Sequence, residues 1–296
     1  MARVDASRYP DPRYTALRQQ LADFHGVAAQ RVVLAGSASA FIFRITAWVA
    51  RCGARAVSTP PHAYGDYAQA ALAHGLATVS SGESAEVHWA CEPSSPLGQP
   101  LDLPGWADAP GIRVLDCAYA PLRLSSQLSV AASVLPTVWQ LYTPNKALGL
   151  TGVRAAYAIA PVDAHNDVQA LEQLCPSWPI GSHGVALLQA WTQPETQDWL
   201  AGSRVTLRNW KVQQIDLCES LGWHCLPSDT SFFCTQPALP SGITLPQALT
   251  NLRTAGIKLR DTTSFHLPGM VRLGVLPPAA QAALKTAWYV LTKAPQ

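Results

Sequence analysis

The feature that most constrains the fold is a series of short, continuously apolar segments that alternate with helical ones. The segments with the composition of buried strands are RVVLAG, ARAVSTP, EVHWACEP, IRVLDCAY, VWQLYTPNK and RAAYAIAP. The first two are followed by the helical segments SASAFIFRITAWVARC and YGDYAQAALAHG. Strands that are apolar throughout and alternate with helices predict a mainly parallel sheet that is covered on both faces.

The pattern changes after Pro179. A long helical segment, interrupted near Pro194, is followed by short strands, a helix near LPQALTNLRTAG and a final helix, PAAQAALKTAWYVLTKA. This mixture predicts a smaller α+β domain. We therefore expect an N-terminal segment at residues 1–25, a large domain at 26–180, and an interdomain helix with a small domain at 181–296.

The composition argues against several classes of function. Charged residues make up 14% of the chain and hydrophobic residues 48%, whereas charged residues are about 25% of an average soluble domain. So little charge leaves much apolar surface to cover, and a large subunit interface is one way to cover it. The net charge of +2 and the lack of any Lys/Arg-rich run predict no nucleic-acid partner.

No membrane, secreted or metal-binding class is indicated. The N-terminus has no apolar signal-peptide core, and the most apolar run carries Arg44 near its middle, so we expect a cytoplasmic protein with no membrane partner. The seven cysteines form no CxxC pair, and no Cys/His spacing is typical of zinc. We therefore expect buried reduced thiols and no metal site.

Polar residues gather where the predicted strands end. They are Gly36-Ser37, Ser94-Ser95, Asp116, Tyr119 and Lys146. Ligands of parallel sheets bind beyond the carboxyl ends of the strands. In LYTPNKALGLTGVRAAYAIAP, a lysine and an arginine stand eight residues apart in an otherwise apolar segment. That arrangement favours a site that holds a reactive amine and binds an anion.

Taken in order, these residues supply what pyridoxal 5'-phosphate (PLP) requires. The cofactor needs a lysine of lowered pKa and a carboxylate for its pyridinium nitrogen. It also needs a donor to its phenolic oxygen, a helix N-terminus with a cation for its phosphate, and an aromatic ring against its pyridine face. The sequence therefore predicts PLP as the cofactor.

Six segments are similar to motifs of one known family: YPDPRYTALRQQLADFHGV, VVLAGSASA, PHAYGDY, DCAY, TPNKALGLTGVRAAYAIA and IKLRDTTSFHLPGMVRLGV. Through them the chain resembles the fold-type I, class I/II aminotransferases, in the branch of histidinol-phosphate aminotransferase and threonine-phosphate decarboxylase. The resemblance covers almost the whole chain. It implies a mainly parallel seven-stranded sheet in a large α/β/α domain and a small α+β C-terminal domain. It also implies an N-terminal segment that packs on the small domain and on a dimer partner.

The resemblance implies a role for each matching residue. Lys146 would be the Schiff-base lysine and proton shuttle, Asp116 the partner of the pyridinium nitrogen, and Tyr119 a donor to the phenolic oxygen; these three form the expected catalytic set. Tyr64 would stack on the ring, and Ser95 would contact the phenolic oxygen. The residues expected at the phosphate are Gly36, Ser37, Ala38, Thr143 and Arg154.

Three further residues concern the substrate and the partner subunit. The resemblance implies that Arg272 binds the substrate carboxylate or an equivalent anion, with Arg260 as a candidate for a second anionic group. Tyr9 would reach the phosphate in the neighbouring subunit, which implies a homodimer with shared active sites.

Two departures from the family pattern stand out. The family loop N-P-x-N-P-T-G is EPSSPLG in this chain, so Ser95 occupies the position of the second asparagine. The family usually begins with an N-E-N-P-Y-type segment over the substrate, and the chain is expected to lack it. The substrate pocket is then either more open or closed by other residues.

Three functions remain open at this stage. The first is an aminotransferase that moves an amino group between an amino acid or amino-phosphate donor and a 2-oxo acid. The second is a decarboxylase of a phosphorylated amino acid, which would use the same cofactor residues. The third is a catalytically impaired PLP-binding or interaction protein. The sequence favours the first.

Overall fold

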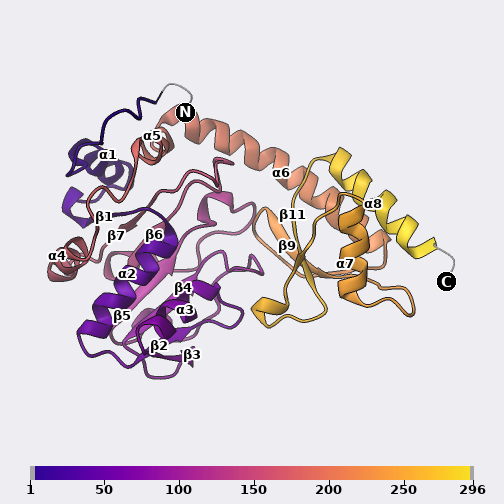
Figure 1. Ribbon diagram of the computed structural model, residues 1–296, viewed down its shortest axis with the longest axis horizontal. Helices are drawn as coiled ribbons and strands as arrows, with labels where there is room; N and C mark the ends of the chain where they lie inside the picture. Colours follow the sequence, from indigo (N-terminus) through magenta and orange to yellow (C-terminus); the bar gives the residue numbers. More distant parts are fainter. Residues whose placement is uncertain (1–3, 294–296) are drawn as a thin grey trace.

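The computed structural model describes residues 4–293 and contains two β-sheets (Figure 1). The larger sheet has the strand order β1-β7-β6-β5-β4-β2-β3. Its strands are β1 (Val32–Ala35), β2 (Ala56–Thr59), β3 (Ala77–Ser80), β4 (Val87–Cys91), β5 (Ile112–Asp116), β6 (Trp139–Tyr142) and β7 (Ala156–Ile159). Residues 1–3 and 294–296, the ends of the predicted first and last segments, lie outside the described residues.

The larger sheet is mainly parallel, as predicted. Strand β7 runs antiparallel to both of its neighbours, β1 and β6. The remaining neighbours pair in parallel. Strand β3 was not predicted, because residues 77–80 lie at the sheet edge and are mostly exposed. An exposed edge strand lacks the apolar run by which the buried strands were found.

Helices cover both faces of the larger sheet, which confirms the predicted layers. One face carries α2 (Ala38–Arg51), α3 (Gly65–Ala73) and α4 (His165–Gln173), and the other carries α1 (Thr15–His25) and α5 (Ser182–Trp191). Successive residues of β1 belong alternately to the two hydrophobic cores. Side chains of a strand point alternately to the two faces, so both faces must be apolar to be buried.

The N-terminal helix differs from expectation in what it contacts. We expected this segment to pack on the small domain. Instead, α1 packs on strand β1 of the larger sheet and on helix α5, which covers the same face. Its buried residues, Leu17, Leu21 and Ala22, join the core under that face. They are spaced as one helical stripe, and the apolar face of β1 is the surface that covers it.

The smaller sheet has the order β10-β11-β9-β8 and is antiparallel. Helix α6 runs from the larger sheet to the smaller one (Figure 1). It begins at Pro194, where the interruption was predicted, and proline is well suited to the first turn of a helix. The elements of this part are α6 (Pro194–Ser220), β8 (His224–Cys225), β9 (Phe232–Gln236), α7 (Leu245–Thr254), β10 (Arg260–Asp261), β11 (Val271–Gly274) and α8 (Pro278–Lys293).

Short 3₁₀ helices join several of these elements. They are η1 (Ala29–Arg31), η2 (Trp106–Asp108), η3 (Ala120–Leu122), η4 (Leu135–Thr137) and η5 (Thr263–Phe265).

A loop after β4 fastens the two sheets together. The backbone N–H of Asp229 donates to the carbonyl of Gly98 at 2.6 Å, and the side chain of Gln99 donates to Pro227. Gly98 has a φ of +74°, and a Cβ there would lie 2.3 Å from the Ser228 hydroxyl. Only glycine fits this close approach, so the loop is held firmly against the smaller sheet.

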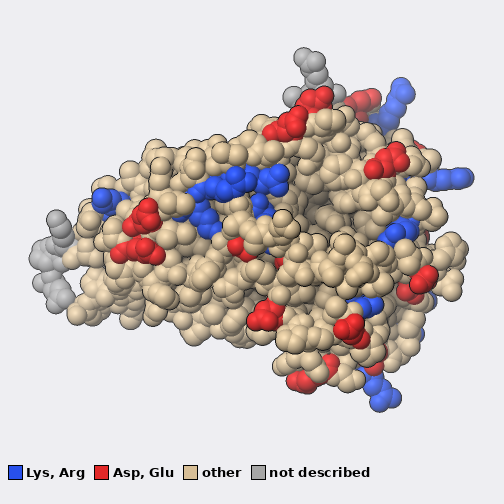
Figure 2. Space-filling model, turned by 180° about the vertical axis from the view of Figure 1, so that it is seen from behind, with Lys and Arg blue, Asp and Glu red and all other residues tan. Residues whose placement is uncertain are grey.

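The surface is poor in charge over wide areas. Figure 2 shows the face opposite to that of Figure 1: most of it is uncharged, and several Lys and Arg side chains form a group near its middle, while others lie singly around it. Within residues 4–293, the helices are too short or too polar to span a bilayer.

We predict that His25 makes stability depend on pH. Its ring lies 2.8 Å from the Tyr157 hydroxyl, and burial lowers its pKa to about 4 from an ordinary value of 6.5. The folded state therefore resists a proton that the unfolded chain accepts. The free energy of unfolding should be full above pH 6.5 and fall by on the order of 2 kcal/mol as the pH drops toward 4.

Urea unfolding between pH 4 and pH 7 tests this prediction. H25Q keeps a hydrogen-bonding side chain but cannot titrate, so its stability should vary less with pH than that of the wild type. H74Q, a change at an exposed histidine, should behave as the wild type does. Equal pH dependence in H25Q and the wild type would contradict the assignment.

Candidate active site

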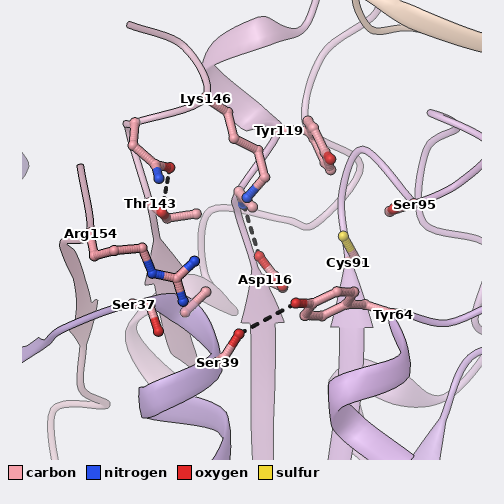
Figure 3. Close-up of a pocket in the computed structure, with 13 residues that line it drawn as sticks. Ser37, Ser39, Tyr64, Cys91, Ser95, Asp116, Tyr119, Thr143, Lys146 and Arg154 are labelled. Carbon is pink, nitrogen blue, oxygen red and sulfur yellow. Dashed lines mark hydrogen bonds between the residues drawn. The ribbon is translucent and has the colours of Figure 1, made fainter. Parts of the chain in front are cut away.

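The carboxyl ends of the strands of the larger sheet enclose one pocket (Figure 3). Strands β4 and β5 end at Cys91 and Asp116, and the segment after β6 carries Thr143 and Lys146. The space between the lining residues, including the part open to solvent, is about 570 Å³. The lining residues are Ser37, Ala38, Ser39, Tyr64, Cys91, Ser95, Asp116, Ala118, Tyr119, Thr143, Asn145, Lys146 and Arg154.

Lys146 presents its amine in the middle of the pocket. Figure 3 shows its side chain directed toward the end of β5. Burial lowers the pKa of Lys146, and the nearby Asp116 carboxylate offsets part of that shift. Within residues 4–293, Nζ has no hydrogen-bond or ion-pair partner, and its ring contact is Tyr119, with the centroid at 5.3 Å. An amine with a lowered pKa is more often neutral and is thus available as a nucleophile and proton carrier.

Asp116 supplies a buried carboxylate below the lysine. The residue is 4% exposed. The backbone N–H of Ala118 donates to Oδ1 at 2.9 Å, and the hydroxyl of Tyr67 donates to Oδ2 at 2.7 Å. Burial raises the pKa of Asp116, while these two donors and Lys146 lower it. A carboxylate in such surroundings is a strong acceptor for a cationic N–H group.

The start of α2 and Arg154 form a cradle for an anion. The Ser37 hydroxyl caps the helix by accepting the Ala40 N–H at 3.0 Å. The first helical bond runs from Phe41 to Ser37, so the amides of Ala38 and Ser39 have no partner within the helix. Figure 3 shows the guanidinium of Arg154 beside Ser37 and Ser39. Free amides and a cation at a helix N-terminus bind phosphate well.

Two tyrosines complete the pocket walls. Tyr64 precedes α3, and its hydroxyl lies 3.3 Å from that of Ser39. Tyr119 follows β5 and meets the ring of Phe232 edge-on, with centroids 4.7 Å apart. Burial raises the pKa of Tyr119. The phenol is therefore protonated near neutral pH and can donate a hydrogen bond.

These groups fit PLP on grounds that the structure itself supplies. The pocket holds one amine of lowered pKa, a buried carboxylate that accepts two hydrogen bonds, a protonated phenol and a helix N-terminus beside an arginine. In the same order, these groups match the aldehyde, the ring nitrogen, the phenolic oxygen and the phosphate of the cofactor. Within residues 4–293, no group of three or more His, Cys, Asp or Glu side chains is arranged to hold a metal ion.

Four of the predicted site residues lie outside the pocket wall. Gly36 adjoins it, and a Cβ there would lie 2.8 Å from the Pro179 carbonyl. Arg272 reaches the wall through Nη1, which donates to the Ser95 hydroxyl at 3.3 Å. Arg260 is exposed and donates to Ser264 at 3.0 Å. Tyr9 is 77% exposed and stacks on Trp178, with ring centroids 4.4 Å apart.

Sequence reasoning missed several residues of the site. The lining residues not predicted are Ser39, Cys91, Ala118 and Asn145. Three of them stand within two residues of a predicted position, so a wider window around each motif would have found them. Tyr67 does not line the pocket, but its hydroxyl donates to Asp116. The sequence indicated it only by its position one helical turn after Tyr64 in YGDY.

Comparison with known proteins gives the same assignment. Residues 81–287 match the family described as aminotransferase class I and II. Histidinol-phosphate aminotransferase of Thermobifida fusca is 31% identical over 260 residues, which cover 78% of this chain and 68% of that protein.

Solved structures share the fold. Histidinol-phosphate aminotransferase from Sinorhizobium meliloti, in complex with pyridoxal-5'-phosphate, superposes with a TM-score of 0.81 at 20% identity, over 98% of this chain and 84% of that one. L-threonine-O-3-phosphate decarboxylase from Porphyromonas gingivalis gives 0.77 at 19% identity, over 96% and 90%.

The chain therefore belongs to the family of class I and II aminotransferases. It has the type I fold of PLP enzymes, and it is a PLP-dependent aminotransferase that acts on small molecules, as the sequence predicted. The third function considered above, a catalytically impaired binding protein, is set aside.

We predict that Arg154 contributes strongly to cofactor affinity. R154Q removes the cation beside the N-terminus of α2, and a hydrogen bond to a charged group is worth about 10-fold to 100-fold in binding. The dissociation constant for PLP, measured by quenching of tryptophan fluorescence, should rise by that factor. R51Q, at the exposed far end of α2, is the matched control. Unchanged PLP affinity in R154Q would contradict the cradle.

Proposed function

We propose that this enzyme transfers an amino group between a donor that carries a phosphate or similar anion and a 2-oxo acid. The observation that carries the donor class is a pair of arginines beside the pocket. Arg260 and Arg272 are direct partners in the antiparallel pair β10–β11. Side chains at directly opposed positions lie on the same face of a sheet, a few ångströms apart. Two guanidinium groups on one face suit a dianion better than a single carboxylate.

Aromatic contacts support this subsite. The guanidinium carbons of Arg260 and Arg272 lie 5.5 Å and 5.7 Å from the centroid of the Phe265 ring. Arg272 also lies over the Phe232 ring, at 5.1 Å. Such contacts hold a guanidinium in place without using its N–H groups. The donors of Arg272 are then largely left for a substrate, apart from the bond to Ser95.

For the chemistry, we assign each pocket residue one task. When bound, PLP acts as an electron sink for the substrate's Cα. Lys146 would anchor the cofactor covalently and, once released by the donor amine, would hold and move the proton at Cα. Asp116 would keep the ring nitrogen protonated. Tyr119 and Ser95 would donate to the phenolic oxygen.

The remaining assignments concern binding. Tyr64 would cover one face of the ring and exclude water from it. The phosphate of the cofactor would be held by the residues of the cradle: Gly36, Ser37, Ala38, Thr143 and Arg154. In support, Thr143 is fixed by its bond to Asn145 at 2.8 Å, next to Lys146.

The names of similar proteins bear on the donor. The relative from Thermobifida fusca is named for histidinol phosphate, and the structure from Porphyromonas gingivalis is named for L-threonine-O-3-phosphate. Both names contain a phosphorylated substrate, which agrees with the two arginines. They differ in the bond that is broken, so decarboxylation is the alternative that the reaction test must include.

We also propose a cytoplasmic homodimer with shared active sites. Its support is the exposed aromatic pair of Tyr9 and Trp178, together with the low charge of the surface. Tyr9 would reach the cofactor phosphate of the partner subunit. Residues 26–180 would form the large PLP-binding domain, and residues 181–296 would form the interdomain helix and the small C-terminal domain. A monomeric mass in sedimentation would overturn the shared site.

The substrate proposal predicts how the arginines affect kinetics. R272Q should lower kcat/KM for a phosphorylated amine by about 100-fold, mainly through KM, because it removes a partly buried donor to the anion. R260Q should lower it by about 10-fold, since Arg260 is exposed and screened by water. R253Q, at an exposed position of α7, should have no effect.

The same assay separates the possible reactions. Histidinol phosphate and phosphothreonine are offered with and without 2-oxoglutarate, while amino-group transfer and carbon dioxide are both measured. Transfer that depends on the 2-oxo acid supports the proposal, and release of carbon dioxide without it selects the decarboxylase. If the unphosphorylated amines react equally well and R272Q leaves their ratio unchanged, the anion subsite is wrong.

A further inference from the structure

Behind the pocket, a tyrosine that does not line it touches the Asp116 carboxylate. The Tyr67 hydroxyl lies 2.7 Å from Oδ2 of Asp116, and Tyr67 is 0% exposed. The other hydrogen bond to this carboxylate comes from the backbone N–H of Ala118. Among residues 4–293, no Lys or Arg forms an ion pair with it. Tyr67 is therefore the side chain that holds the carboxylate from within the protein.

The ring of Tyr67 is fixed by its surroundings. It stacks on Trp89 of β4, with centroids 4.4 Å apart and an angle of 9° between the planes. It also meets Tyr64 edge-on at 5.8 Å. Both Tyr67 and Trp89 belong to the hydrophobic core between the sheet and α2 and α3. A phenol held this way can present its hydroxyl in one direction only.

Two tyrosines at the start of helix α3 thus contribute to the same site: one lines the pocket, and the other is buried behind it. Tyr64 stands at its N-cap on the pocket wall, and Tyr67 stands one turn later beneath it. Residues three apart on a helix lie on the same face. One rigid helix therefore sets both the ring that covers the cofactor and the group that orients Asp116.

We propose that Tyr67 is a positioning residue that keeps the Asp116 carboxylate ionised and aimed at the ring nitrogen of the cofactor. A donor to an ionised carboxylate stabilises that form against the protonated acid, and it restricts rotation of the side chain. In an apolar site these effects are larger than in water. This inference rests on the proposed role of Asp116.

The inference gives a defined expectation for Y67F. This change removes the hydroxyl and leaves the ring to stack on Trp89. Without the donor, the carboxylate binds a proton more readily, so the acid limb of the absorbance of bound PLP, followed against pH, should move to higher pH. The dissociation constant for PLP should rise, and kcat should fall by about 10-fold to 100-fold with KM changed less than about 3-fold.

Y14F is the matched control. Tyr14 is also buried, and its hydroxyl donates to the carbonyl of Ile180 at 2.7 Å, away from the pocket. Y14F should lose stability, as any variant with a missing buried hydrogen bond does, but it should keep the wild-type pH profile and kcat. If both variants shift alike, the role of Tyr67 is structural only.

The outcomes separate this inference from the proposed function. Wild-type holoenzyme that carries PLP on Lys146, together with a Y67F spectrum that titrates as the wild type does, would overturn the role of Tyr67 alone. Wild type without PLP on Lys146 would overturn the proposed function instead. A shifted acid limb in Y67F, with Y14F unchanged, supports the inference.

Discussion

The site depends on burying two groups of opposite charge at one edge of a parallel sheet. Burial raises the pKa of Asp116 and lowers that of Lys146, while the attraction between them offsets part of both shifts. Burial thus favours the neutral amine of Lys146, while the hydrogen bonds from Tyr67 and Ala118 and the charge of Lys146 favour the ionised carboxylate of Asp116. The strands that end at this edge bring the two groups together, because parallel neighbours β5 and β6 finish side by side.

The smaller sheet contributes a residue next to the pocket that the larger sheet forms. The loop after β4 carries Ser95 into the pocket, and it is fastened to the smaller sheet at Gly98. From β11, Arg272 donates to the same serine. A hydrogen bond of 3.3 Å therefore links Arg272, which we propose to bind the substrate anion, to the wall of the pocket.

Much of the fold could be predicted because buried strands leave a plain apolar pattern. The same holds for the helix break at Pro194 and for the polar residues at strand ends such as Asp116 and Lys146. Edge strand β3 could not be found, since it is exposed and lacks that pattern. The docking of α1 and the bond from Tyr67 to Asp116 depend on contacts between segments far apart in the chain. Such contacts follow from tertiary packing and leave no periodic signal.

The most direct measurement asks which lysine carries the cofactor. Besides Lys146, the chain has four lysines that could carry it: Lys211, Lys258, Lys285 and Lys293. Purified protein is loaded with PLP, reduced with borohydride, digested and mapped by mass spectrometry. We expect a yellow protein before reduction and a single phosphopyridoxyl peptide that contains Lys146. A label on another lysine, or no label at all, would contradict it.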